Sequence, residues 1–332
     1  MIITMDHNSI VIRKIENADF WRLVNLYDEV WPEVSYDKEK KANFVLNESR
    51  GIRYCAEING EIVGSRVSFY MNCYYGTKKL SCIQVGDTCT RKDCRGKGLL
   101  AKMSKALLKD FFQDSQGDLI WNISVEATRK GNEKLGWVYI NSLATLVKVC
   151  RPFHIISSIG MKLSSLKGVV NWDLDDEEID IKETFLEGRE CEINKKELIH
   201  VKYDKETIQW RLKTQSGIKA YEDKDKGTVL YKKGTKNGLV FVLIGEVFAK
   251  QYDEKTIRAL LKGLKRATNA DLLKTAVSMG HPMLLFYKKA GFVFNPRKKY
   301  LDHGVKVESE EMKRICYNPQ NWAISMLDVD TF

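Results

Sequence analysis

The sequence has no long apolar run and no paired cysteines, and these two absences exclude several classes of protein. Its 332 residues are 44% hydrophobic, yet no stretch approaches the roughly 20 apolar residues of a transmembrane helix. Residues 1–7 include an acid and no extended apolar core, so they do not fit a secretory signal peptide. The eight cysteines form no C-x-x-C pair and have no histidine partners at zinc spacing. We expect a cytoplasmic protein with free cysteines, no membrane contact and no metal site.

Positive charge is not concentrated in any one part of the sequence. The formal net charge is +10, but lysine is spread along the whole chain. The densest basic segments, residues 38–41 and 297–299, are shorter than a convincing nucleic-acid-binding tract. We expect no nucleic-acid partner, although the net charge favours the approach of a polyanionic ligand.

A Gly-rich loop is the most informative feature that the sequence does contain. An apolar strand at residues 80–85 leads through a polar loop to Arg95-Gly96-Lys97-Gly98. A helix follows at once, because apolar residues recur at helical spacing from Leu99 to Phe111. The spacing is neither G-x-G-x-x-G nor G-x-x-x-x-G-K-[ST]. Glycine backbone at a helix N-terminus, with two cations beside it, predicts a site for a diphosphate.

A second motif lies downstream in the same half. Residues 118–124 predict a buried strand, and a polar helical stretch begins at about residue 126. That stretch closes with Lys134-Leu-Gly-Trp137. Glycine after a helix, followed by an aromatic residue that opens a strand, indicates a C-cap with chain reversal.

Together the two motifs resemble those of the GCN5-related N-acetyltransferase (GNAT) family. R-G-K-G resembles the pyrophosphate loop of that family, [RQ]-x-x-G-x-[GA], and K-L-G-W is similar to its K-L-G-[FW] signature after the CoA-binding helix. The sequence departs from the pattern at Leu100, where the family prefers Gly or Ala, a position that mainly needs its backbone N–H. The predicted order of strands and helices over residues 9–150 is also that of the GNAT fold.

The length suggests two domains, and the second half contains an internal repeat. Residues 287–294 parallel residues 132–139 at an offset of 155, which is 287 minus 132. The same offset predicts a helix at 254–267 and a strand at 238–242. Lys250-Gln-Tyr-Asp253 replaces R-G-K-G there, and its acid would repel a phosphate.

The fold class that we expect is therefore α/β (α+β), with two GNAT-like modules, each a mixed, mostly antiparallel twisted sheet flanked by helices. Residues 1–150 form the module with the acetyl-CoA site. Residues 151–200 form a linker region that includes a solvated acidic run. Residues 201–332 form a degenerate module that has lost the cofactor.

The resemblance implies which residues bind the cosubstrate, acetyl-CoA. In the family, the backbone of the strand before the loop pairs with the pantetheine arm, and the loop holds the diphosphate. The matching positions in this sequence are Thr88, Cys89, Thr90, Arg95, Gly96, Lys97, Gly98, Leu99 and Leu100. No cysteine–histidine partnership accompanies Cys89, so we expect direct transfer rather than a covalent intermediate.

The sequence indicates the catalytic groups less directly than it indicates the cosubstrate-binding residues. The family's common general acid is a tyrosine at the position of Asn132, so the resemblance leaves that role open. Candidate bases are Asp87, before the loop, and Glu126, at the start of a helix, and either acid could instead cap a turn or complement a helix dipole. A third candidate is the terminal carboxylate of Phe332, because some multi-domain GNAT acetyltransferases place theirs in the active site. The alternative for the C-terminus is a frayed tail.

We expect an N-acetyltransferase that transfers an acetyl group directly from acetyl-CoA to a primary amine. A small-molecule amine or amino sugar is the favoured acceptor, while aminoglycosides, peptides and proteins remain open. One alternative is a Fem-type aminoacyl transferase that uses charged tRNA, against which the R-G-K-G loop argues. Another is an acyl-CoA-binding or scaffold protein that has lost catalysis.

Overall fold

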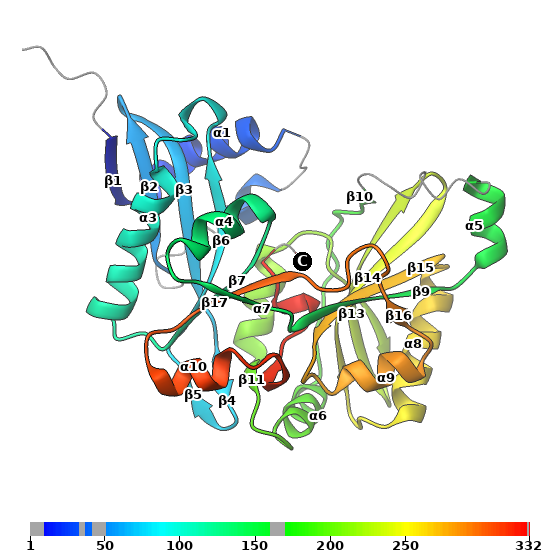
Figure 1. Cartoon of the computed structure of the whole chain (residues 1–332). Coiled ribbons are helices and arrows are strands. Elements are labelled where there is room, and N and C mark those ends of the chain that lie inside the picture. The colour runs from blue at the N-terminus through cyan, green and yellow to red at the C-terminus, as the bar shows by residue number, and fades with distance from the viewer. Residues whose placement is uncertain (1–9, 33–36, 42–50, 160–169, 331) are drawn as a thin grey trace, which may run out of the picture. The chain divides into compact units, whose positions relative to one another are not determined.

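The computed structural model describes residues 10–32, 37–41, 51–159, 170–330 and 332. These residues form two compact units that alternate along the chain. The first unit comprises Met1–Met71, Leu80–Tyr139 and Gly304–Lys313, and the second comprises Asn72–Lys79, Ile140–His303 and Arg314–Phe332. The elements can be followed in Figure 1.

The first unit is built on a seven-stranded sheet of order β1-β2-β3-β6-β7-β17-β8. The β2–β3 hairpin turns at Asn59 and Gly60, which both have positive φ angles, as the Asn-Gly pair requires. The strands are β1 (Ile10–Lys14), β2 (Arg53–Ile58), β3 (Glu61–Tyr70), β6 (Cys82–Thr90), β7 (Leu119–Ser124), β17 (Asp302–Lys306) and β8 (Val138–Ile140).

Helices pack on this sheet through apolar faces. α1 contacts β3, and α3 contacts β1, β2, β3 and β6. The apolar spacing after the Gly-rich loop produces the predicted helix, because Leu99, Met103 and Leu107 are buried. The helical segments are η1 (Asn17–Asp19), α1 (Phe20–Val30), η3 (Lys92–Cys94), α3 (Leu99–Leu108), the π-helical η4 (Lys109–Asp114) and α4 (Glu126–Glu133). Residues 38–41 are also helical, and residues 42–50 lie outside the described residues.

The second unit has a sheet of order β10-β13-β14-β15-β9-β16, with β12 paired to β13. The same unit also contains a four-stranded sheet of order β18-β11-β4-β5. The strands are β4 (Cys73–Tyr75), β5 (Lys78–Lys79), β9 (Leu143–Val149), β10 (Asn171–Trp172), β11 (Ile199–Val201), β12 (Lys219–Asp223), β13 (Gly227–Lys236), β14 (Leu239–Ala249), β15 (Leu272–Ser278), β16 (Val293–Phe294) and β18 (Trp322–Ala323).

The remaining described helices lie between Pro152 and Asp328. α8 packs on β12, β13 and β14, and its buried residues Ile257, Leu260 and Leu264 confirm the predicted apolar face. The helices are α5 (Pro152–Ile159), α6 (Glu183–Ile193), α7 (Lys205–Thr214), α8 (Glu254–Thr268), α9 (Met283–Lys289), α10 (Glu310–Cys316), η6 (Pro319–Asn321) and η7 (Met326–Asp328).

The two sheets share a local plan. In each, a long strand runs parallel to the next strand of the sheet, and their described pairing covers only three positions: Cys82–Gln84 with Leu119–Trp121, and Phe241–Leu243 with Leu272–Lys274. In each, a helix connects the parallel strands. The mixed, mostly antiparallel sheets with flanking helices confirm the predicted fold class.

Each sheet also contains one strand from the other half of the sequence. β17, from residues 302–306, lies between β7 and β8, whereas β9, from residues 143–149, lies between β15 and β16. The compact units therefore do not coincide with the predicted boundaries at 150 and 200. A short apolar strand carries no signal for which of two similar sheets it joins, so the sequence could not indicate the exchange.

The segment predicted as a linker, residues 151–200, contains regular structure. It forms α5, β10, α6 and β11, and it belongs to the second unit. α6 buries Phe185, Leu186 and Ile193, but it also buries Arg189. A charged residue on the buried face interrupts the helical apolar pattern, so periodicity does not predict this helix. One acid of the acidic run forms an ion pair, since Lys219 Nζ lies 3.1 Å from Asp173 Oδ2.

Three further observations concern membrane spans, metal ligands and cysteines. Within the described ranges, no helix combines the length and apolar character that crossing a membrane requires. The same part of the chain contains no cluster of three potential metal ligands. All eight cysteines are free, and only Cys191 among them is exposed.

Candidate active site

The Gly-rich loop leaves the N-terminus of α3 open. Gly96 and Gly98 have φ angles of +81° and +71°, and a Cβ built on either would meet nothing within 4 Å. Backbone conformation rather than crowding therefore requires glycine at both positions. Gly98 is the N-cap of α3, and no side chain caps the helix there. The first N–H groups of an α-helix have no partner inside the helix, so this end can bind an anion.

Two cations and one buried leucine complete the loop. Arg95 and Lys97 are exposed, and Arg95 Nε donates to the carbonyl oxygen of Thr90 at 3.2 Å. That bond joins the loop to the end of β6. Leu99 is buried against Ala56, Val63 and Met103, so the first turn of α3 is fixed to the sheet while its N-terminus stays accessible.

Leu100, the departure from the family pattern, has a matching glycine opposite it. A Cβ at Gly131 of α4 would lie 2.6 Å from Leu100 Cδ2. The larger side chain is thus accommodated by a missing side chain on the neighbouring helix. The presence of Leu100 in place of a small residue therefore changes the packing of α3 on α4. The backbone N–H of residue 100 stays in place.

β6 and β7 separate next to this loop. Beyond the pairing at Gln84 and Trp121, β6 continues to Thr90 and stays paired with β3. A bulge interrupts the β3–β6 ladder between Ser65 and Val67, and Asp87 has a φ angle of +41°. The predicted cosubstrate residues Thr88, Cys89 and Thr90 lie in this separated part of β6.

Cys89 is a poor nucleophile in this setting. It is 5% exposed, and its Sγ lies 3.3 Å from Ser65 Oγ. Burial raises the pKa of the Cys89 thiol to about 12. The thiolate is the nucleophilic form of cysteine, so the environment agrees with direct transfer.

The two predicted acids of this unit have different surroundings. The Asp87 carboxylate forms an ion pair with Lys41 Nζ, and its Oδ2 is buried without a hydrogen-bond partner in the described structure. Glu126 lies in the first turn of α4 with its side chain 80% exposed, and it pairs with Lys130 at 2.9 Å. Asp87 is therefore the acid that the fold holds beside the separated strands, while Glu126 has the geometry of a surface helix residue.

Sequence reasoning missed a buried polar cluster on the same sheet. Arg66 of β3 is fully buried and donates to Asn132 Oδ1 at 3.0 Å and to Thr88 Oγ1 at 3.3 Å. Asn132 Nδ2 donates to the Tyr139 hydroxyl at 3.0 Å, and that hydroxyl lies 2.7 Å from Ser124 Oγ. An arginine in the middle of a strand that also contains Ile62, Val63, Val67 and Phe69 was the available signal.

The equivalent helix of the second unit, α8, has a capped N-terminus. Asp253 is the N-cap of α8, and its carboxylate accepts from Thr256 N at 2.8 Å. A carboxylate of the chain itself thus satisfies the donors that a phosphate would use. Tyr252, next to it, donates to the carbonyl oxygen of Val247 at 2.5 Å.

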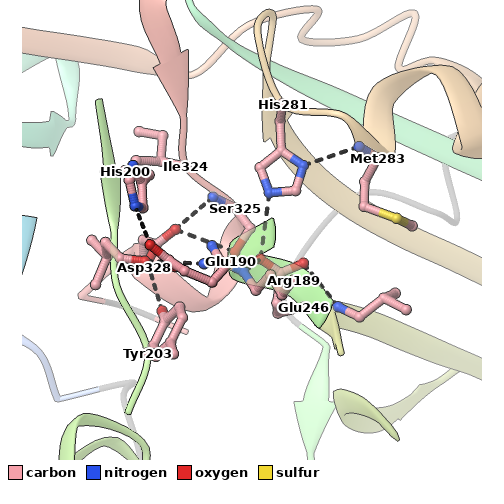
Figure 2. A network of polar contacts seen from close by, with 12 residues as sticks. Arg189, Glu190, His200, Tyr203, Glu246, His281, Met283, Ile324, Ser325 and Asp328 are labelled. Carbon is pink, nitrogen blue, oxygen red and sulfur yellow. Dashed lines mark hydrogen bonds and ion pairs between the residues drawn. The ribbon is translucent and has the colours of Figure 1, made fainter. Parts of the chain in front are cut away.

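The second unit instead contains a buried polar network, which Figure 2 shows from close by. Arg189 Nε donates to Glu246 Oε2 at 2.8 Å, and both side chains are 1% exposed. His281 Nε2 lies 3.4 Å from the same carboxylate oxygen. Burial by itself would raise the pKa of Glu246, but Arg189 and His281 lower it to about 2. This carboxylate is ionised and paired.

The described C-terminal residues are packed rather than frayed. Tyr203 donates to Asp328 Oδ1 at 2.5 Å, and Arg211 donates to the carbonyl oxygens of Leu327 and Val329. Phe332 is fully buried, and a Cβ at Gly245 would lie 2.5 Å from its ring. The expectation of a frayed tail does not hold for these residues, because buried donors fix its backbone. The catalytic role suggested for Phe332 stays a prediction.

Comparison with known proteins agrees with these features. Residues 11–140 match the family model described as an acetyltransferase (GNAT) domain. The matched residues include the Gly-rich loop and K-L-G-W. No curated protein sequence gives a significant match.

Solved structures extend the likeness of fold to most of the chain. A GCN5-related N-acetyltransferase from Anabaena variabilis is 12% identical with a TM-score of 0.63, over 90% of this chain and 73% of that one. Eis1 from Mycobacterium abscessus is 15% identical with a TM-score of 0.54, over 90% and 74%. N-myristoyltransferase from Saccharomyces cerevisiae, solved with bound myristoyl-CoA, is 11% identical with a TM-score of 0.56, over 92% and 79%. At these identities the likeness establishes the fold alone.

Proposed function

We propose that this protein transfers an acyl group from acyl-CoA to a primary amine, and that the natural donor is acetyl-CoA. The observation that carries the proposal is the open N-terminus of α3, with two glycines at positive φ and two exposed cations, beside the separated strands β6 and β7. Backbone N–H groups there would hold the diphosphate of CoA. The backbone of Thr88, Cys89 and Thr90 would pair with the pantetheine arm.

Transfer proceeds directly from the thioester to the amine in this proposal. The buried, protonated thiol of Cys89 supports the absence of an acyl-enzyme. Asp87, Glu126 and the Phe332 carboxylate are the candidate bases. The acceptor in this proposal is a small-molecule amine or amino sugar, because the basic residues of the sequence form no nucleic-acid-binding tract.

The CoA site is tested by thermal unfolding with and without acetyl-CoA. A ligand that binds only the folded state raises the unfolding temperature. Acetyl-CoA should raise it for the wild type, and Arg95→Glu and Gly98→Glu should abolish the increase. Lys250→Glu, at the equivalent loop of the second unit, is the matched control and should keep it. Titration calorimetry should give one CoA per chain. An unchanged increase in both loop variants would remove this site.

The base candidates are tested by turnover against a panel of amines, with free-thiol release as the readout. For the true base, Asp87→Asn or Glu126→Gln should lower kcat by ~100-fold or more without loss of CoA binding. Because Arg211 holds Leu327 and Val329, a deletion of the tail would disturb folding. A single glycine added after Phe332 moves the terminal carboxylate with less disturbance, and full activity in that variant would exclude this group.

A binding protein without turnover is the second candidate function. It is favoured by one observation, the amide of Asn132 at the position where the GNAT resemblance implies a catalytic tyrosine. Tight CoA binding with no thiol release across the whole panel would support it.

A further inference from the structure

Arg66 carries a buried positive charge without a carboxylate partner. Its side chain is fully buried, and its hydrogen-bond acceptors in the described structure are the neutral oxygens of Asn132 and Thr88. Its Nε has no acceptor. Burial lowers the pKa of Arg66 to about 10, so the guanidinium is still charged at neutral pH. An unpaired buried cation is costly, and a cost of this kind in a candidate site indicates a function.

The guanidinium fixes the orientation of the neighbouring amide. Arg66 can only donate hydrogen bonds, so Asn132 must present Oδ1 to it and Nδ2 to the other side. Nδ2 donates to the Tyr139 hydroxyl at 3.0 Å. The phenol oxygen is therefore an acceptor in this contact.

The donor in the second hydrogen bond of the phenol can be assigned in the same way. Asn122 Nδ2 donates to Ser124 Oγ at 2.8 Å, which leaves the Ser124 hydroxyl proton for Tyr139 at 2.7 Å. Ser124 is 6% exposed, whereas Tyr139 is half-buried. Leaving a hydroxyl proton without an acceptor costs more free energy at the buried Ser124 than at Tyr139. Tyr139 thus accepts twice, and its own proton has no acceptor in the described part of the chain.

The cluster lies where the two strands separate. Thr88 belongs to the part of β6 beyond its pairing with β7, and Ser124 belongs to the part of β7 beyond Trp121. The ring of Tyr139 lies over Gly304 of β17, where a Cβ would approach its Cζ to 2.8 Å. Only glycine leaves space for the phenol in this position.

We infer that Tyr139 is the general acid of acyl transfer, held by Asn132 and Ser124, with Arg66 and Asn132 as positioning residues. The inference rests on the proposed function. It also explains why Asn132 can stand at the position of the family's tyrosine. The Asn132 amide holds the phenol of Tyr139, from β8, by one hydrogen bond.

The chemical step balances as follows. The amine nitrogen forms a bond to the thioester carbonyl carbon, and the carbonyl electron pair moves to oxygen. On collapse the C–S bond breaks, sulfur leaves with the electron pair, and the Tyr139 hydroxyl gives it a proton. The nitrogen loses its proton to the base, and a proton returns to the phenolate, so that amine and acyl-CoA become amide and CoA thiol. The charge of Arg66 stabilises the phenolate while it exists.

Turnover gives the first test. Tyr139→Phe should lower kcat by ~100-fold or more, the range for a positioned acid, with little change in the Kd of acetyl-CoA. Tyr54→Phe is the matched control, because Tyr54 is a partly buried tyrosine of the same apolar cluster whose hydroxyl contacts Asp110. Difluorotyrosine at position 139 has a more acidic phenol, so the alkaline limb of kcat should move to lower pH. A merely structural tyrosine would not move it.

Binding gives a second test that needs no acceptor. A hydrogen bond to sulfur contributes ~0.5–1.5 kcal/mol, so the wild type should bind CoA about 2- to 12-fold more tightly than desulfo-CoA. That preference should disappear in Tyr139→Phe and persist in Tyr54→Phe. Equal kcat in wild type and Tyr139→Phe, or an equal preference for CoA, would overturn the inference. Failure of the proposed function is distinct, since the wild type would then either bind neither ligand or bind CoA without releasing thiol with any amine of the panel.

Discussion

At the scale of single residues, two equally buried arginines have opposite surroundings. Arg189 pairs with the carboxylate of Glu246, whereas Arg66 donates only to neutral oxygens in the described structure. Removal of one partner from a buried ion pair leaves the other charge uncompensated, but removal of an unpaired cation relieves a cost. We therefore expect Arg66 to act in the site rather than in stability.

The two arginines should respond differently to the same substitution. Arg189→Met should lower the free energy of unfolding by about 3–5 kcal/mol, because Glu246 loses its partner. Arg66→Met should leave it unchanged or raise it by ~1 kcal/mol or more, while kcat falls at least tenfold. Urea unfolding and thiol release measure the two effects. A similar loss of stability in both variants would contradict this reading.

His303 makes stability depend on pH. It is fully buried, beside Ser142, and burial lowers the pKa of its imidazole from 6.5 to about 3. Between these values the unfolded chain binds a proton that the folded chain does not, so stability falls as pH falls. The loss between pH 6.5 and 4.5 should reach about 2 kcal/mol. Below pH 4.5, Glu246 adds its own loss, because its pKa is also lowered.

The variant His303→Gln should flatten this dependence between pH 6.5 and 4.5. His154→Gln, at a side chain that is 39% exposed, is the control and should keep the slope. Thermal unfolding over this pH range measures it. An equal slope in wild type and His303→Gln would assign the loss of stability to other groups.

At the scale of elements, the sequence predicted best where the signal is local. The glycines of the Gly-rich loop and the apolar face of α3 each depend on a few neighbouring residues. The exchange of β9 and β17 depends on partners far along the chain, so no local pattern indicates it. The same applies to Tyr139, because its partners Asn132 and Ser124 lie on other elements.

The two helices that follow the long strands differ in one capping residue. Asp253 caps α8, whereas Gly98 at α3 leaves its end open. Asp253→Ala should cost about 1 kcal/mol of stability through loss of the cap. It should not create a second CoA site, because the second loop also lacks the glycines that allow close approach. Calorimetry that returned two CoA per Asp253→Ala chain would show that the cap alone closes that site.

At the scale of the whole molecule, the exchanged strands make each sheet depend on both halves of the sequence. β17 lies between β7 and β8, and β9 lies between β15 and β16. A cut at residue 150 leaves the first sheet without β17 and the second without β9. Internal strands supply hydrogen bonds on both edges, so each fragment would expose two unpaired strand edges.

Fragments 1–150 and 151–332 should therefore each fail to fold cooperatively alone, and should be recovered together when co-expressed. Cooperative unfolding and acetyl-CoA binding are the measurements. The control joins residues 1–140 through a Gly/Ser linker to residues 301–313, which restores β17 to its sheet and should recover both properties. If residues 1–150 alone unfolded cooperatively and bound acetyl-CoA as tightly as the full chain, β17 would not be needed to complete the sheet that holds the Gly-rich loop.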